Sequence, residues 1–456
     1  MEFVHRTYQP GDTIAAIATP PGEGGVAIVR ISGVESISVA EKIFSGPIRS
    51  YKTHTAHYGK VLDAEGNVVD EVLALVMLAP KSYTGEDTVE IHCHGGNLIS
   101  KHVLDTILKA GARAAQPGEF TFKAFINGKL DLAQAEAVQE LIGAKNELAL
   151  QMAEQQLQGK ISKSILSFQK KLVDITAILE AWVDFPEEDL EFATMDEIVG
   201  GLTEILHQME HLAATYHDGK IVSHGITLCL AGPPNVGKSS LMNALLGKER
   251  AIVTNIPGTT RDLIEEEMKW GKLHFRLIDT AGIRDTEEII EREGIRRSKE
   301  AMEQADLILL VLDATQAICP QSELLISNAP QEKTIFIWNK IDLLEANPPP
   351  IDNAIFISAK EGIGLNHLQQ SIHQFIWRKG PPVKEEVVIT NLRHHQALMN
   401  AIGALQMVIE GLKTAVSPEF VSADLRKVLS ELGMIIGTNI TEDILSAIFS
   451  KFCIGK

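Results

Sequence analysis

The residue types best suited to chemistry occur in a glycine-rich segment, GPPNVGKS at positions 232–239. An apolar run at 227–231 precedes it, and a helical pattern at 240–246 follows. In this strand, loop and helix order, backbone N–H groups and the start of the helix surround phosphates. We expect Lys238 to reach the β and γ phosphates of a nucleotide and Ser239 to bind Mg²⁺. Taken alone, the segment has one alternative interpretation, a glycine-rich turn that arose by chance.

A second motif, DTAG at 279–282, follows the apolar run 275–278. An acidic residue at a strand end, here Asp279, can hold Mg²⁺ through water, and Gly282 can approach the γ-phosphate. The segment TNIPGTTRD lies between the two motifs. A hydroxyl there, which we expect to be that of Thr260, joins the Mg²⁺ shell only when the γ-phosphate is present. This segment is therefore a candidate switch.

Two further motifs predict the base that the site accepts. The sequence NKID at 339–342 follows the apolar run 335–338, and its carboxylate, Asp342, suits the two N–H donors on the guanine edge. The sequence SAK at 358–360 follows the run 354–357 and completes a base pocket. Adenine does not offer the same donors, so the four motifs together predict GTP with Mg²⁺.

The residue after DTAG is Ile283, whereas many small GTPases have a glutamine there to orient the attacking water. Either hydrolysis is slow or another group enters the site. Acidic candidates follow at Glu287, Glu288, Glu291 and Glu293, although a solvated helix surface would have the same pattern.

Length and composition limit the class of protein. With 456 residues the chain exceeds the size of a single core, and about 150 residues per domain predicts about three domains. The longest apolar runs, such as 307–312, are far shorter than the roughly 20 residues of a membrane span, and the start lacks a secretory signal pattern. We therefore expect a cytoplasmic protein. The net charge of −18 argues against broad nonspecific binding to nucleic acid but permits a local basic surface.

The chain has a different pattern on each side of the phosphate-binding motifs. Short β-type runs at 13–18, 25–31, 71–79 and 88–94, with helical patches at 39–44 and 98–108, predict an α+β domain.

Apolar residues three or four apart predict one long helix from Leu157, ended by Pro186, and a second helix over 198–212. The same stripe returns at 398–412 and 425–432. We expect these helices to form one bundle into which the nucleotide domain is inserted; the alternative is two independent helical hairpins.

The segment GTTRD at 258–262, the inserted domain and the ending FCIGK at 452–456 resemble the MnmE (TrmE) family of tRNA-modification GTPases. The resemblance covers nearly the whole chain, and its further motifs are TPPGEGG at 19–25, YTGED at 83–87, PGEF at 117–120 and KLDLAQAEA at 129–137.

The resemblance implies a multidomain fold that combines α/β, α+β and all-α parts, with a P-loop GTPase domain inserted into a helical domain. The implied domains are 1–120, an N-terminal α+β folate-binding and dimerisation domain; 121–220, the first part of the helical domain; 221–380, a Ras-like P-loop GTPase domain; and 381–456, the second helical part with FCIGK.

Motifs and resemblance together give a set of GTP-binding residues. They are Asn235, Val236, Gly237, Lys238, Ser239, Ser240, Thr254, Asn255, Ile256, Pro257, Gly258, Thr259, Thr260, Asp279, Thr280, Ala281, Gly282, Asn339, Lys340, Asp342, Ser358, Ala359 and Lys360. The resemblance also implies that hydrolysis follows dimerisation of two GTPase domains and uses K⁺. The implied K⁺ ligands are Asn235, Thr254, Ile256 and Thr259, the Mg²⁺ ligands are Ser239 and Thr260, and Glu291 positions the water.

The resemblance further implies a site for 5,10-methylenetetrahydrofolate, with 5-formyltetrahydrofolate as an analogue. The matching residues are Arg30, Glu90, Lys129 and Lys456. A pterin edge needs a carboxylate and a glutamate tail needs cations. The alternative for Arg30 and Glu90 is a surface pair, because both are expected at strand ends.

Cys453 is the fourth residue from the end. A thiol on a mobile tail near a one-carbon carrier suggests a nucleophile or an acid–base group, whereas a packed small residue is the plainer interpretation. Prenylation fits poorly, because Gly455 and Lys456 follow.

The implied function is that of a homodimeric GTPase acting with the flavoprotein MnmG (GidA) in a heterotetramer or larger complex, without a membrane. The pair would add an aminomethyl or carboxymethylaminomethyl group to C5 of the wobble uridine of tRNA. One alternative is an Era-like ribosome-assembly GTPase that acts only as an RNA-binding switch. Another is a folate-dependent aminomethyltransferase with an accessory GTPase.

Overall fold

The chain divides into two compact units. The first comprises Met1–Gly143, Ala153–Glu210 and Gln396–Lys456, and the second comprises Ala144–Met152 and His211–His395. The computed structural model describes residues 11–184, 194–246, 265–270, 273–279, 301–344, 348, 351–377, 380, 386–414, 416 and 418–456.

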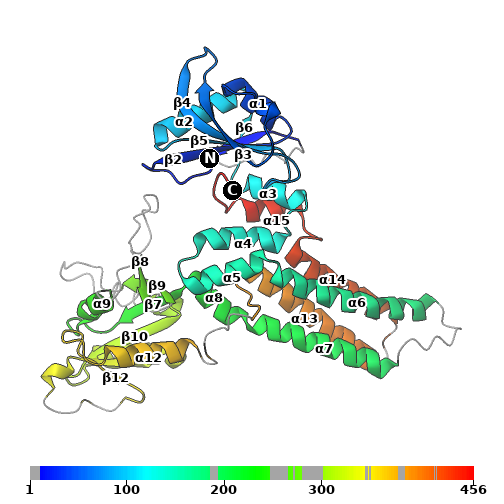
Figure 1. Ribbon diagram of the computed structural model, residues 1–456. Helices are drawn as coiled ribbons and strands as arrows, with labels where there is room; N and C mark the ends of the chain where they lie inside the picture. The colour runs from blue at the N-terminus through cyan, green and yellow to red at the C-terminus, as the bar shows by residue number, and fades with distance from the viewer. Residues whose placement is uncertain are drawn as a thin grey trace. The chain divides into compact units, whose positions relative to one another are not determined.

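The first unit begins with a six-stranded sheet in the order β3-β4-β5-β2-β1-β6 (Figure 1). Its strands are β1 (Ile14–Ile17), β2 (Val26–Ser32), β3 (Thr55–Leu62), β4 (Val68–Met77), β5 (Thr88–His94) and β6 (Arg113–Ala114). All pairs are antiparallel except β1 with β6. Four strands match the predicted β-type runs to within a few residues, whereas β3 and β6 were not predicted.

Alternation along the strands gives this sheet two different faces. Val29, Ile91 and other apolar residues of β2, β4 and β5 are buried with residues of α1 (Ser36–Ile43) and α2 (Asn97–Lys109), such as Val103. A 3₁₀ turn at Ile48–Ser50 follows α1. Residues at the intervening strand positions therefore point away from these helices, and they include Arg30 and Glu90.

The same unit contains the long helices. They are α3 (Glu119–Ile126), α4 (Leu132–Gly143), α5 (Glu147–Leu157), α6 (Lys160–Asp184), α7 (Met195–Ala214), α13 (Leu392–Lys413), α14 (Pro418–Ile436) and α15 (Glu442–Phe449), of which α5, α7 and α13 extend into the second unit. The predicted long helix is confirmed as α6, which ends at Asp184, but its predicted start at Leu157 is wrong, because α5 ends there and α6 starts at Lys160. Gly159 between them has φ +77°, a left-handed conformation that favours glycine and interrupts a helix.

Helices from both ends of the chain contact each other in this unit. Arg426 of α14 donates to the Glu180 carboxylate of α6 at 2.7 Å, and Gln169 of α6 donates to the Leu429 carbonyl at 3.3 Å. Gln406 of α13 donates to Glu210 of α7 at 3.2 Å. Helices that precede the second sheet in the chain thus pack against helices that follow it.

The second unit is built on a six-stranded sheet in the order β12-β11-β10-β7-β9-β8. The strands are β7 (Ile226–Ala231), β8 (Glu265–Trp270), β9 (Leu273–Asp279), β10 (Leu307–Asp313), β11 (Thr334–Asn339) and β12 (Ile355–Phe356). Only β8 is antiparallel to its neighbour. The helical segments are α8 (Tyr216–His224), α9 (Lys238–Leu246), α11 (Pro320–Asn328) and α12 (Leu365–Ile376), with 3₁₀ turns at Gln331–Lys333 and Ile341–Leu343.

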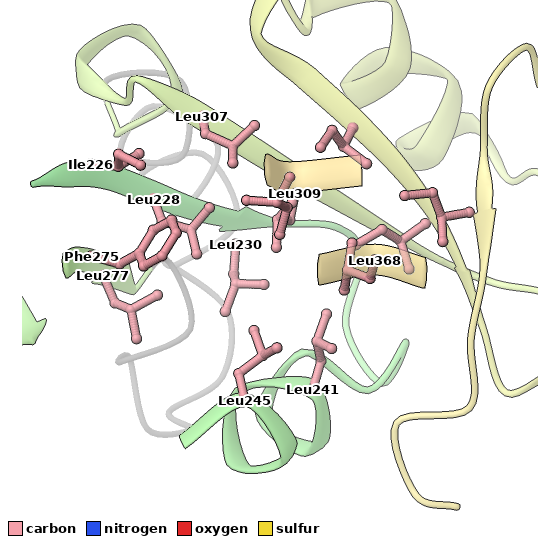
Figure 2. Close-up of a cluster of buried hydrophobic side chains, with 14 of the residues drawn as sticks. Ile226, Leu228, Leu230, Leu241, Leu245, Phe275, Leu277, Leu307, Leu309 and Leu368 are labelled. Atoms are coloured by element: carbon pink, nitrogen blue, oxygen red, sulfur yellow. The ribbon is translucent and has the colours of Figure 1, made fainter. Parts of the chain in front are cut away.

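Both faces of the parallel part of this sheet are covered, as apolar strands such as β7 and β10 require. Figure 2 shows Leu241 and Leu245 of α9 facing strand residues such as Leu230, in a cluster that also includes Leu368 of α12. A second cluster contains Ile308 and other strand residues that alternate in the sequence with those of the first cluster. The carboxyl ends of parallel strands meet at one edge, which is where such sheets bind ligands. None of the helices in the described ranges combines the length and apolar composition that a bilayer crossing demands.

Candidate nucleotide site and C-terminal thiol site

The glycine-rich segment forms the connection from β7 to α9. Lys238 is the first residue of α9, and its ammonium donates to the carbonyls of Gly232 and Pro233, both at 2.8 Å. The ammonium therefore lies inside the curve of the loop, where phosphates bind in this type of loop. Asn235 has φ +62° at the exposed tip, and Ser239 is exposed in the first turn of the helix.

Asn339, at the end of β11, connects the phosphate loop to the base-binding segments. Its side-chain amide donates to the Val236 carbonyl at 2.9 Å, and its oxygen accepts from the Ala359 N–H at 3.0 Å. The residue is only 2% exposed. A side chain at Gly237 would collide with the Asn339 amide, so glycine is required there by this close approach. The sequence predicted Asn339 as a base-pocket residue but did not predict this bridging role.

Lys340 forms an ion pair that sequence reasoning missed. Its ammonium lies 2.6 Å from the Asp313 carboxylate at the end of β10, and Thr315 donates to the same carboxylate through its N–H and hydroxyl. Burial raises the pKa of Asp313, but the hydrogen bonds from Lys340 and Thr315 outweigh it, so the net shift of the pKa is downward. In the sequence, the only local indication of this ion pair was that Asp313 directly follows an apolar run.

The remaining base-side residues lie on two connected loops. Asp342 is exposed in the 3₁₀ turn Ile341–Leu343, whose first N–H donates to the Ile357 carbonyl at 3.2 Å. Ser358 is fully buried and accepts from the Glu361 N–H at 3.2 Å, whereas Lys360 is exposed. The Asp342 carboxylate and the Lys360 side chain are thus both exposed, on loops whose backbone is held by hydrogen bonds.

Part of the predicted nucleotide site lies outside the described residues. Asp279 is the last residue of β9, in register with Leu230 of β7. The hydroxyl of Ser239, in the first turn of α9, is an oxygen ligand of the type that Mg²⁺ prefers. The predicted residues outside the described ranges are Thr254, Asn255, Ile256, Pro257, Gly258, Thr259, Thr260, Thr280, Ala281, Gly282 and Glu291.

A second group of polar residues lies on the first sheet. Arg30 on β2 and Glu90 on β5 are direct cross-strand neighbours, and the guanidinium Nε lies 2.8 Å from Glu90 Oε1. Their side chains are only 14% and 12% exposed. The alternative of a surface pair at strand ends is wrong, because both residues lie within their strands and are mostly buried. The Arg30 guanidinium also lies 5.8 Å from the ring centre of Tyr83, a contact that sequence reasoning missed.

The C-terminal segment contacts the same group. Arg30 donates to the Gly455 carbonyl at 3.2 Å, and Gly455 is buried against the Ile17 carbonyl. Burial lowers the pKa of the Lys456 side chain, and the charge of Arg30 lowers it further, although Glu90 opposes this shift. The structure thus brings together three of the four predicted folate residues. Lys129 is exposed and donates to the Pro80 carbonyl at 3.0 Å, on the loop that leads to Tyr83.

Cys453 is exposed, but its backbone is held on both sides. Phe452 is 5% exposed and packs on Phe449 with ring centres 5.2 Å apart, while the Cys453 carbonyl accepts from the Gly118 N–H at 3.3 Å. The expectation of a free tail is therefore wrong, because packed residues flank the thiol. This anchoring holds the exposed Cys453 two residues before Gly455, whose carbonyl accepts from Arg30.

Comparisons with known proteins cover the whole described architecture. The family model described as MnmE helical domain matches residues 132–453, and the one described as GTP-binding protein TrmE N-terminus matches residues 13–129. The tRNA modification GTPase MnmE of Protochlamydia amoebophila is 62% identical, with 100% of both chains covered. Its counterpart in Thermoanaerobacter pseudethanolicus is 43% identical over 98% of this chain and 99% of its own.

Solved structures match smaller parts of the chain. A crystal structure of Aquifex aeolicus Era bound to GDP and AlF4⁻ is 25% identical and covers 40% of this chain and 67% of its own. Its TM-score is 0.27.

Proposed function

The chain belongs to the MnmE (TrmE) family of tRNA modification GTPases, and from this premise we propose that it hydrolyses GTP with Mg²⁺ during modification of the wobble uridine of tRNA. The observation that carries the nucleotide part is the Asn339 bridge, which fixes the phosphate loop and the base loops relative to each other. The curated relatives named above are tRNA modification GTPases, so the Era-like RNA switch is not favoured.

Each group of the nucleotide site has a proposed chemical role. When bound, Mg²⁺ supplies charge neutralisation at the β and γ phosphates. Lys238 contributes a cation at the same phosphates, and Asp342 accepts the guanine N–H donors. We further propose that K⁺, held by Asn235 with Thr254, Ile256 and Thr259, neutralises charge on hydrolysis, and that Glu291 positions the water after two GTPase domains dimerise.

We propose that the modification chemistry belongs to the first unit. The family resemblance suggests a tetrahydrofolate one-carbon donor, and the Arg30, Glu90 and Lys456 group fits such a ligand because it offers a fixed carboxylate between cations. Bound there, the donor supplies the one-carbon unit for C5 of uridine. The accessible thiol of Cys453 is then suited to act as a nucleophile or an acid–base group.

The assembly and its domains are also proposals. The contacts of α6 with α14 and of α7 with α13 support a helical domain, 121–220 and 381–456, into which the GTPase domain, 221–380, is inserted after a folate domain, 1–120. We propose a homodimer that works with the flavoprotein MnmG (GidA) on tRNA in the cytoplasm.

The hydrolytic proposal is tested by measuring phosphate release from GTP in matched KCl and NaCl buffers with Mg²⁺. We expect strong turnover in KCl and a large loss in NaCl, with Asn235→Ala losing the K⁺ stimulation. Equal rates in both salts would remove the K⁺ role of Asn235. Turnover of ATP as fast as GTP would contradict the assignment of the base pocket.

A further inference from the structure

The two oxygens of the Glu90 carboxylate have different partners in the described sheet. Oε1 lies 2.8 Å from Nε of Arg30 on the neighbouring strand, and Oε2 lies 3.3 Å from Nε2 of His92, two residues along β5. Because side chains alternate along a strand, Glu90 and His92 share the face that points away from α1 and α2. The carboxyl group is therefore held by one donor on each oxygen.

The strand neighbours of His92 are apolar, so His92 lies apart from the cations Arg30 and Lys456. Its cross-strand neighbours are Ile28 on β2 and Leu73 on β4, both apolar, and its own side chain is 27% exposed. The Glu90 side chain beside it is 12% exposed. The imidazole thus lies against the Glu90 oxygen that Arg30 does not contact, and it remains partly exposed at the surface.

An ionised carboxylate has about four lone-pair sites, and two donors leave roughly two of them for a ligand. With a donor on each oxygen, rotation of the carboxyl group would break at least one hydrogen bond. Hydrogen bonds to charged groups are roughly twice as strong as those between neutral groups, so the orientation is well defined. A planar ligand edge with two adjacent N–H donors requires such a fixed carboxylate, because both donors must be met at once.

We propose that His92 is a positioning residue for the donor edge of a pterin: it donates from Nε2 to Glu90 and fixes the carboxylate in the orientation that the ligand requires. This inference rests on the proposed folate site. The class of ligand that it implies is a fused heterocycle with neighbouring ring N–H and exocyclic NH₂ groups.

The test is titration calorimetry of the full-length protein with 5-formyltetrahydrofolate. His92→Leu keeps the side-chain bulk without a donor, and we expect its affinity to fall about tenfold, as loss of a charge-assisted hydrogen bond predicts. His92→Gln restores an N–H donor, and we expect affinity within about threefold of the unaltered protein. The exposed His102 of α2 gives a matched control, because His102→Leu should leave affinity unchanged.

The outcomes separate the inference from the proposed function. Unaltered protein that fails to bind 5-formyltetrahydrofolate would overturn the folate site and this inference together. Binding that is lost in Glu90→Gln but unchanged in His92→Leu would overturn only the role of His92. If His92→Gln is as weak as His92→Leu while both melt like the unaltered protein, the donor is not what matters and the inference is wrong.

Discussion

Asp313 shows how one buried carboxylate shapes the base side of the nucleotide site. Its side chain is 5% exposed, and its partners Lys340 and Thr315 lower its pKa below the ordinary value of 3.8. A lowered pKa in the folded state means that the charged form stabilises the protein above the unfolded-state pKa. That stabilisation is lost as the pH falls through the folded-state value.

We therefore expect Asp313→Asn to lower the free energy of unfolding at neutral pH by about 1–2 kcal/mol, and the melting temperature with it. The difference from the unaltered protein should shrink as the pH falls below about 4, because the native carboxyl then becomes neutral too. Differential scanning fluorimetry across this pH range measures it, with the exposed Asp352→Asn as control. A difference that stays constant down to pH about 2 would exclude a contribution from the charge.

Cys453 provides a second test at the same scale. Cys453→Ser keeps the size and the backbone contacts of the residue but removes thiolate chemistry. We expect tRNA modification to be abolished while GTP hydrolysis stays within about twofold of the unaltered protein. Nucleoside mass spectrometry and phosphate release measure the two activities. If modification survives, the thiol takes no part in the chemistry.

The residues that a sequence can reveal are those set by short local patterns. Phosphates and guanine impose such patterns on Lys238, Asn339 and Asp342, so each could be proposed from its motif. Asp313 could not, because its contact with Lys340 depends on which strands lie side by side. Residues brought together by strand order leave little signal in a single chain.

At the scale of elements, Asn339 connects the ends of β7, β11 and β12. Removing its side chain would leave the Val236 carbonyl and the Ala359 N–H without this partner in a buried place. We expect Asn339→Ala to lower the melting temperature by about 5 °C or more, since each unsatisfied buried group costs roughly 1–3 kcal/mol. GTP affinity, measured by titration, should fall at least tenfold.

A matched control for this prediction is Asn328→Ala, because Asn328 is exposed at the end of α11. It should change neither melting temperature nor affinity. An Asn339→Ala protein with normal GTP affinity would show that the base loops hold their positions without the bridge.

The elements themselves differ in how much the sequence reveals. Buried strands such as β7 and β10 are continuous apolar runs and were predicted. The edge strand β3 was missed because only Gly59 and Val61 of its eight residues are buried. The break between α5 and α6 was missed because the apolar stripe continues across Gly159.

At the scale of the whole molecule, the predicted nucleotide-binding residues and Cys453 lie in different compact units. The helices on either side of the nucleotide unit in the chain contact one another in the first unit. Ile283 lacks the amide that orients water in many GTPases, so either hydrolysis is slow or a further group enters the site. These features favour a GTPase that controls a reaction performed elsewhere in the chain.

The most direct test of this account is nucleoside mass spectrometry of tRNA from a strain whose own member of this family is deleted. We expect the C5-carboxymethylaminomethyl or aminomethyl uridine to disappear on deletion and to return with a plasmid copy of the unaltered chain. The copy with Lys238→Ala should not restore it, whereas the exposed-site variant Asn328→Ala should. Wobble uridine that is modified equally in all strains would contradict the account.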